Sequence, residues 1–189
     1  MATTSDVRVG TTIRYNGELC TVFEWEHRTP GNLRAFYQAK LKSMKTGKML
    51  ENRFRSGEEV EIVRVERKKY QYLYRDGDSF VFMDQETFEQ INVDASIIGE
   101  SAKFLKESEV IDILFSESNE IIFAELPITV VLRIDKTDPG VRGDTATGGS
   151  KPATLETGAV VNVPLFLNEG DYIKVDTRTG EYLERVKQS

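Results

Sequence analysis

Residues 18–43, ELCTVFEWEHRTPGNLRAFYQAKLKS, decide the fold of the first part of this chain. Residues 18–26 and 35–43 each alternate apolar and polar side chains, which is the period of half-buried strands. The eight residues between them are rich in turn formers and in charge. The stretch therefore predicts a long hairpin of two paired strands.

The tip of this hairpin has an unusual composition. Pro30-Gly31-Asn32 is strong turn chemistry, because Pro fixes one φ angle while Gly and Asn tolerate φ above zero. Arg28 and Arg34 flank the turn. A basic tip on two long strands indicates a contact with an anionic partner.

Strand patterns continue on both sides of the hairpin. Residues 12–15 lead through Asn16-Gly17, a two-residue turn signal, and further strands are expected at 49–55 and 60–66. Five short strands with tight turns predict a small closed barrel of the SH3/KOW-like type over residues 1–64.

The middle of the chain predicts a second barrel, of the oligonucleotide-binding (OB) type, over residues 65–127. Its strands are expected at 70–74, 80–83, 110–115 and 121–124, with short helical segments at 96–105 interrupted by Gly99. Tyr70, Tyr72 and Tyr74 share one strand face in this pattern. They fit packing on one face of the strand, a seam between domains, or a base-stacking platform.

A third barrel, again of the OB type, is expected over residues 128–189. Strand patterns occur at 129–134, 159–163, 172–175 and 181–186, with a Gly/Thr/Asp-rich stretch at 137–150. Pro127 and the charged cluster at 66–69 are the expected boundaries. The predicted class is therefore all-β, with three small barrels in series.

Composition indicates a globular protein of the cytoplasm. Of 189 residues, 39% are hydrophobic and 30% charged. No apolar run is long enough to cross a membrane, and the first residues lack a signal-peptide core. The single cysteine, Cys20, falls in a strand pattern and is expected to be a buried core residue.

The charge is uneven along the chain. The net charge of −6 divides into +3 over residues 1–64, −8 over 65–128 and −1 over 129–189. A protein that binds nucleic acid over its whole surface is usually basic overall. Any contact with nucleic acid should therefore be local.

No set of residues predicts catalysis, a metal site or a cofactor. His27 is the only histidine and has no cysteine cluster beside it. Asp84, Glu86 and Glu89 are best explained as a loop with a solvated face. The segment 143–151 lacks the Gly-Lys-Ser/Thr order of a nucleotide P-loop, and Pro152 follows it. We therefore expect that the protein is not an enzyme.

The C-terminal block carries a specific resemblance. Residues 151–182, KPATLETGAVVNVPLFLNEGDYIKVDTRTGEY, resemble the C-terminal signature of bacterial elongation factor P, and TDPG at 137–140 with GDTA at 143–146 resembles the loop upstream of it. YLY with DG at 72–77 and FM with ETF at 82–88 also match. The resemblance covers essentially the whole chain.

The resemblance implies a function that fits the barrels and the basic tip. Members have a tRNA-like outline, bind the 70S ribosome between the peptidyl and exit sites, and promote peptide-bond formation at polyproline stalls. The implied partners are peptidyl-tRNA, ribosomal RNA and, at the exit site, mRNA; no membrane or cofactor is implied, and a monomer is expected. The acidic middle would mimic the charge of a tRNA body.

The family's tip residues correspond to Pro30-Gly31-Asn32, between Arg28 and Arg34. Many members carry a modified Lys or Arg at the position of Asn32, and neither modification can form on Asn. Either an unmodified tip works through its loop shape and two arginines, or a shifted register presents Arg34, which otherwise starts the returning strand. The implied exit-site contacts are on the C-terminal part: Gly143, Asp144, Thr145, Tyr182 and Arg185.

A second hypothesis is a generic RNA- or single-strand-binding module without a role on the ribosome. Such a module would show a basic, aromatic barrel face, and the charge of −8 in the middle of the chain disfavours it.

Overall fold

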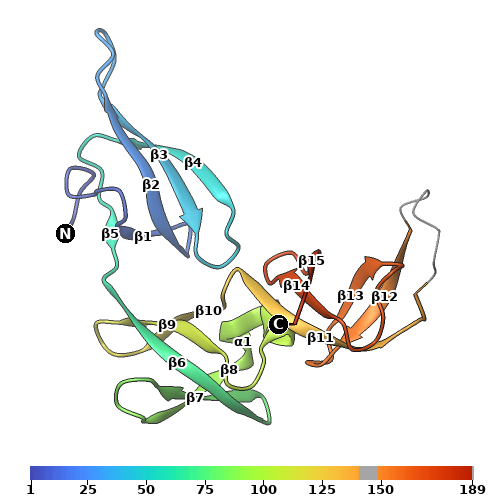
Figure 1. The fold of residues 1–189 in the computed structure, drawn as a ribbon. Helices are drawn as coiled ribbons and strands as arrows, with labels where there is room; N and C mark the ends of the chain where they lie inside the picture. The colour runs from blue at the N-terminus through green and yellow to red at the C-terminus, as the bar shows by residue number, and fades with distance from the viewer. Residues whose placement is uncertain (141–148, 189) are drawn as a thin grey trace. The chain divides into compact units, whose positions relative to one another are not determined.

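A computed structural model gives the fold, and it describes residues 1–140 and 149–188. The described residues form three five-stranded sheets with little helix, which confirms the predicted all-β class (Figure 1). The chain divides into two compact units, residues 1–67 with 114–123 and residues 68–113 with 124–189.

The first sheet is antiparallel, with the order β4-β3-β2-β1-β5. The bounds are β1 Thr12–Tyr15, β2 Glu18–Arg28, β3 Phe36–Ser43, β4 Met49–Arg55 and β5 Glu61–Ile62. Asn16 and Gly17 have φ of 49° and 79°, as the predicted tight turn requires. Cys20 is fully buried in this core, as predicted, and burial raises the pKa of its thiol. The strand expected at 60–66 is wrong, because β5 holds only two residues.

The second sheet has the order β10-β9-β6-β7-β8. Its strands are β6 Val65–Asp76, β7 Ser79–Asp84, β8 Gln90–Asp94, β9 Val110–Ser116 and β10 Ile121–Glu125, with α1 at Ala95–Ile98 and a 3-10 turn, η1, at Gly99–Phe104. The charged cluster at 66–69, expected at a boundary, lies inside β6, and the chain passes from the first compact unit to the second within it, after Arg67. β8 was not predicted from the sequence.

The three tyrosines of β6 do not share one environment. Tyr70 and Tyr72 are buried, and the Tyr72 ring packs against Phe80 and Phe82 at centroid distances of 5.7 and 5.5 Å. The pairing of β6 with β7 shifts between Tyr72 and Tyr74, and Tyr74 is half-exposed. The prediction of one shared face is therefore wrong, because a bulge breaks the alternation.

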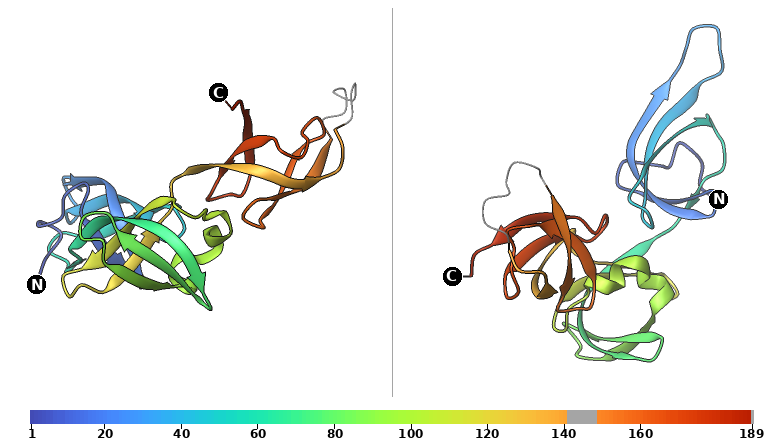
Figure 2. Two further views of the ribbon diagram at one scale, coloured as in Figure 1. Left: turned by 60° about the horizontal axis from the view of Figure 1, so that its bottom comes forward. Right: turned by 90° about the vertical axis from the view of Figure 1, so that its right-hand side faces the viewer.

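The third sheet is antiparallel, with the order β13-β12-β11-β14-β15. Its strands are β11 Thr129–Thr137, β12 Ser150–Leu155, β13 Val160–Pro164, β14 Tyr172–Asp176 and β15 Tyr182–Val186. These strands, drawn as ribbons in two further views in Figure 2, enclose one apolar core. β12 was not predicted, because Ser-Lys-Pro-Ala at its start holds no aromatic or β-branched residue and Pro is depleted in strands.

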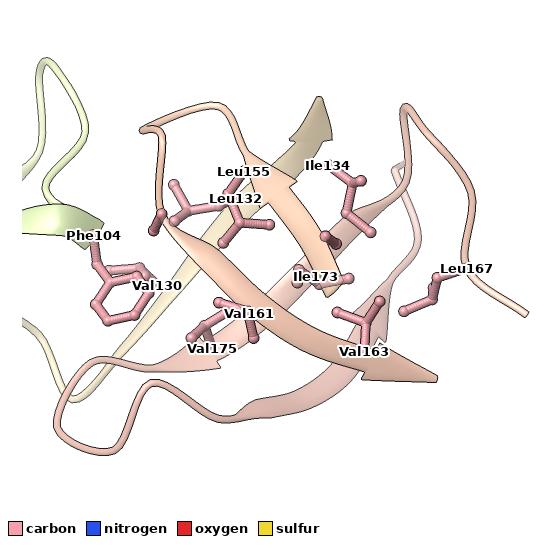
Figure 3. Close-up of a cluster of buried hydrophobic side chains, with 12 residues drawn as sticks. Phe104, Val130, Leu132, Ile134, Leu155, Val161, Val163, Leu167, Ile173 and Val175 are labelled. Atoms are coloured by element: carbon pink, nitrogen blue, oxygen red, sulfur yellow. The ribbon is translucent and has the colours of Figure 1, made fainter. Parts of the chain in front are cut away.

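Phe104 belongs to η1 but packs in the core of the third sheet. Its side chain is 1% exposed and lies beside Val130 (Figure 3). Lys106, two residues later, forms an ion pair of 3.1 Å with Glu156. The carboxylate of Glu156 also accepts the N–H of Arg133. The third sheet therefore depends on a residue outside its own strands.

Truncating this side chain should destabilise the protein strongly. We expect Phe104→Ala to lower the free energy of unfolding by about 3–5 kcal/mol, because it removes a fully buried ring and leaves a cavity. Urea unfolding of the full chain would measure the loss. Phe104→Leu, which fills more of the space, should cost clearly less. Equal losses for both variants would contradict a packing role.

Two hairpin loops are held by an aspartate. Asp84 Oδ1 accepts the N–H groups of Glu86 and Thr87 at 2.7 and 3.2 Å, and the Glu86 N–H is the main cause of a lowered pKa of Asp84. Asp176 Oδ1 accepts the N–H groups of Arg178 and Thr179 at 2.8 and 3.3 Å. The Arg178 side chain, 3.0 Å from Asp176 Oδ2, is the main cause of the lowered pKa of Asp176.

These shifts predict the direction of acid destabilisation. Because the folded-state pKa lies below the unfolded value, the stabilisation is complete above about pH 4 and is lost as the pH falls through the folded pKa. Asp176→Asn keeps an oxygen acceptor but not the charge, so its thermal midpoint should fall less steeply below about pH 4 than that of the parent. Identical slopes would show that Asp176 is not part of the acid response.

Candidate functional site

The hairpin β2–β3 positions the predicted tip. The two strands pair from Cys20 opposite Ser43 to Arg28 opposite Phe36. β1 pairs with β2 only over Glu18–Thr21, so the outer part of the hairpin has no pairing on that side (Figure 1). The tip loop, residues 29–35, therefore lies at the end of a two- to three-stranded projection.

The turn itself differs from the prediction in its backbone. The N–H of Leu33 donates to the carbonyl of Pro30 at 3.1 Å, so Pro30 is the first residue of the turn. Neither Gly31 nor Asn32 has positive φ. The expected use of left-handed backbone is therefore wrong, and other residue types could adopt this turn.

Gly31 has no local reason to be glycine. A Cβ built on it meets no heavy atom within 4 Å. Its φ does not favour glycine either. Asn32 is exposed, and its side chain makes no hydrogen bond within the described part of the chain.

The two arginines that flank the turn, Arg28 and Arg34, differ in their partners. Arg28 lies at the end of β2 and pairs with Glu26 at 2.9 Å, where both side chains are more than half exposed. Such a pair contributes about 0–1 kcal/mol and can be exchanged for another partner. Arg34 is exposed and forms no hydrogen bond or ion pair with residues 1–140 or 149–188. It lies in the loop, since β3 begins at Phe36.

Further arginines, which the sequence reading missed, join this end of the sheet. The register places Arg55 of β4 opposite Phe36, and Phe36 opposite Arg28. Arg34 and Arg55 line one surface pocket with Ala35, Phe36 and Ser56. The signal that could have found Arg55 is the β3–β4 register, because cross-strand neighbours lie on the same face.

Arg53 adds to the same face. Its guanidinium lies 5.1 Å from the centre of the Phe36 ring, and its Nε donates to Gln38 Oε1 at 3.0 Å. We call Arg28, Arg34, Arg53 and Arg55 the tip arginines. Two carboxylates lie beside them: Glu26 pairs with Arg28, and Glu58 accepts the backbone N–H of Arg55. Four guanidinium groups against two carboxylates leave this surface basic, which suits phosphate groups.

The opposite face of the hairpin is aromatic. The Tyr37 ring lies 4.6 Å from His27 and 5.2 Å from Trp25, and Trp25 lies 5.1 Å from Phe54. Trp25 Nε1 donates to the carbonyl of Thr4 at 3.1 Å, which fixes this stack to the N-terminal segment. His27 thus packs on Tyr37 beside the tip, and these ring contacts stiffen the base of the loop.

The structure describes two of the predicted C-terminal contacts. Tyr182 is partly buried against the core of the third sheet, and burial raises the pKa of its hydroxyl. Arg185 pairs with Asp171 at 2.9 Å and is about half exposed. The other three, Gly143, Asp144 and Thr145, lie outside the described residues. The tip and these strands are two separate candidate contacts.

Lys151, considered above for a P-loop, is a buried strand residue. Its ammonium group donates to the carbonyls of Asp138 and Leu167. Since β12 begins at Ser150, no helix follows the segment. This is not the geometry of a phosphate-binding P-loop, which requires a helix N-terminus.

Residues 1–140 and 149–188 contain no cluster of three His, Cys, Asp or Glu that could hold a metal ion. Within the same ranges no helix is long and apolar enough to span a membrane.

The sheets and the basic tip define a protein of serial small β-barrels. Family models agree: an elongation factor P KOW-like domain matches residues 3–60, its OB domain matches 65–123, and its C-terminal domain matches 130–185. The chain belongs to the elongation factor P family, and it is a translation elongation factor.

Relatives agree over the full length. An elongation factor P of Chloroflexus aggregans is 58% identical over 97% of this chain and 98% of its own. One of Roseiflexus sp. (strain RS-1) is 58% identical over 99% of this chain and 100% of its own. A solved eIF-5A family protein from Naegleria fowleri has a TM-score of 0.51 at 16% identity, covering 66% of this chain and 96% of that one, and supports the fold alone.

Proposed function

We propose that this chain binds the ribosome between the peptidyl and exit sites and relieves stalling at polyproline sequences. The tip of the β2–β3 hairpin contacts the acceptor end of the peptidyl-tRNA. The observation that carries the proposal is the set of tip arginines at the end of a stiff projection, in a chain whose net charge is otherwise negative.

Charge and pairing support a nucleic-acid contact at the tip. Arg34 and Arg55 line one pocket and have no ion-pair partner among the described residues. Guanidinium groups bind phosphate oxygens in a bidentate geometry. The weak pair of Arg28 with Glu26 can open when a phosphate approaches, because exposed ion pairs contribute little.

The proposed mechanism is positioning. Contacts from a stiff tip restrict the peptidyl-tRNA near the geometry in which the amine attacks, and such restriction of motion can lower a barrier by several kcal/mol. No side chain of the factor then needs to donate or accept a proton in the reaction.

Asn32 and Arg34 have different roles in the proposed contact. Asn32, unmodified, gives the turn its neutral end and its exposed amide. Arg34, two residues later, supplies the cation. On this proposal the tip works through the shape of its loop, and Arg34 acts from its position two residues after Asn32, without a shift in the alignment to the family. Tyr182, Arg185 and the segment 143–145 form the exit-site contact, with Tyr182 holding the strand in place.

A reconstituted translation assay on a triproline template tests the function. The full chain should relieve the stall, and Arg34→Ala with Arg55→Ala should reduce relief at least tenfold while leaving urea unfolding unchanged within about 0.5 kcal/mol, because both side chains are exposed. Lys45→Ala is the matched control, since it removes one exposed charge at the opposite end of β3.

Three results would be informative against the proposal. No relief by the parent protein from its native host would contradict the function. Relief by the double variant equal to the parent would contradict the role of the tip arginines. Binding to any single-stranded RNA as strongly as to ribosomes would favour the generic RNA-binding hypothesis.

Salt dependence gives an independent measure of the phosphate contacts. Each lost phosphate contact should flatten the slope of log affinity against log salt by about 0.7–0.9. We expect Arg34→Ala and Arg55→Ala each to do so in ribosome binding by filtration. Lys45→Ala should leave the slope unchanged, and a flattened slope there would contradict a contact confined to the tip.

Gly31→Ala separates folding from activity. Because its φ is not positive and its Cβ position is open, the free energy of unfolding should stay the same or rise by up to about 1 kcal/mol. Stall relief should fall, since the added methyl group blocks a close approach of the backbone to the partner. Gly47→Ala, at φ 69°, should instead lower stability and spare activity per folded molecule.

A further inference from the structure

Three hairpin loops of this protein share one backbone design. They run over residues 43–48, 84–89 and 176–181. In each, the N–H of the first residue donates to the carbonyl of the sixth at 2.9 Å. In each, the carbonyl of the first accepts the N–H of the fifth, at 2.8, 3.0 and 2.8 Å respectively.

The fifth residue of every loop has left-handed backbone. The φ values are 69° at Gly47, 62° at Phe88 and 74° at Gly180. Two loops use glycine, the residue with no steric penalty there. The third uses phenylalanine, for which this backbone is a genuine outlier. The comparison shows within one chain that the loop favours glycine and tolerates Phe88 at a cost.

Burial does not offset this cost. The Phe88 side chain is 68% exposed, and no aromatic or cation–π contact to it occurs in residues 1–140 and 149–188. A phenylalanine in a strained, solvated position contributes little to the fold. Its ring is available to a partner.

The charges beside the ring define the chemistry of that partner. Glu86 and Glu89 flank Phe88 and are exposed, while the carboxylate of Asp84 is engaged by the loop N–H groups. Two lysines lie on the neighbouring strand, and each is near a carboxylate other than Glu86 and Glu89. Lys69 pairs with Asp112 at 3.3 Å, and the charge of Lys68 helps to lower the pKa of Asp84. The exposed rim of the loop is therefore acidic.

We propose that Phe88 is a recognition residue for a cationic protein segment, whose arginine or lysine packs on the ring and pairs with Glu86 and Glu89. An aromatic face attracts a cation, and adjacent carboxylates add to this attraction. RNA fits poorly, because two carboxylates would face its phosphates. This contact does not involve the residues of the tip. That the cationic segment belongs to the ribosome rests on the proposed function.

Stability of the isolated protein tests the cost of the ring. Phe88→Asn, with a side chain that tolerates left-handed backbone, should raise the thermal midpoint by roughly 2–4 °C. Gly47→Phe, which places the same ring in the same loop design where nothing lies within 4 Å of the Cβ, should lower it by a similar amount. A lower midpoint for Phe88→Asn would overturn the inference, because Phe88 would then be a structural residue.

Affinity for purified 70S ribosomes tests the contact. Phe88→Asn should weaken binding by roughly 3- to 30-fold, and Glu86→Gln with Glu89→Gln should weaken it in the same direction. Gly47→Phe should bind as the parent does. Unchanged binding by both the Phe88 and the glutamate variants would overturn the inference.

Photocrosslinking identifies the partner class. The photoreactive analogue p-benzoylphenylalanine is placed at position 88, or at the exposed Leu33 of the tip, and the full chain is irradiated on ribosomes. A crosslink from position 88 that survives ribonuclease and is lost with protease supports the inference. A crosslink to RNA overturns it.

The tip position keeps the two proposals apart. If position 33 crosslinks and position 88 does not, the inference fails and the proposed function stands. If neither position crosslinks, the ribosomal function fails, and the ribosome-derived partner fails with it.

Discussion

The pairing of β2 with β3 is the constraint on which the rest of the N-terminal unit depends. Its register shifts between Val22 and Glu24, so that Phe23 is an extra residue on β2. Because side chains alternate along a strand, one extra residue reverses the faces beyond it. The bulge therefore puts Trp25 and His27 on the aromatic side and leaves Arg28 on the other. Without the bulge, the Arg28 side chain would lie on the aromatic face of the hairpin.

The two faces of the hairpin do different physical work. On one, the contacts of Trp25, Tyr37 and His27 bury apolar area and hold the strands straight toward the loop. On the other face, Arg28, Phe36 and Arg55 form a cross-strand row. Its charges contribute little to the free energy of unfolding, since they are exposed. Rigidity and available charge are thus separated across one sheet. This lets the tip meet an anion without first losing much conformational entropy.

The sequence predicts local features of this fold better than distant ones. The two strands predicted within residues 18–43 and the Asn16-Gly17 turn depend on neighbours in the chain, and both are confirmed. Phe104 in the third sheet and Arg55 beside Arg28 depend on long-range packing and register, which no local pattern records. β12 was missed for a related reason: its Lys151 and Pro152 look like a loop, and only pairing with β11 and β13 makes the segment a strand.

Gly31 and Phe88 are mismatched to their local structure in opposite ways. The turn at Gly31 has room for a side chain and a backbone that accepts one, yet it carries none. The loop at Phe88 has the backbone that favours glycine, as Gly47 and Gly180 show, yet it carries a large exposed ring. A fold under selection for stability alone would lose both mismatches, because single substitutions remove them. The absent side chain at Gly31 and the strained, exposed ring at Phe88 therefore both support the contacts proposed above, one at each position.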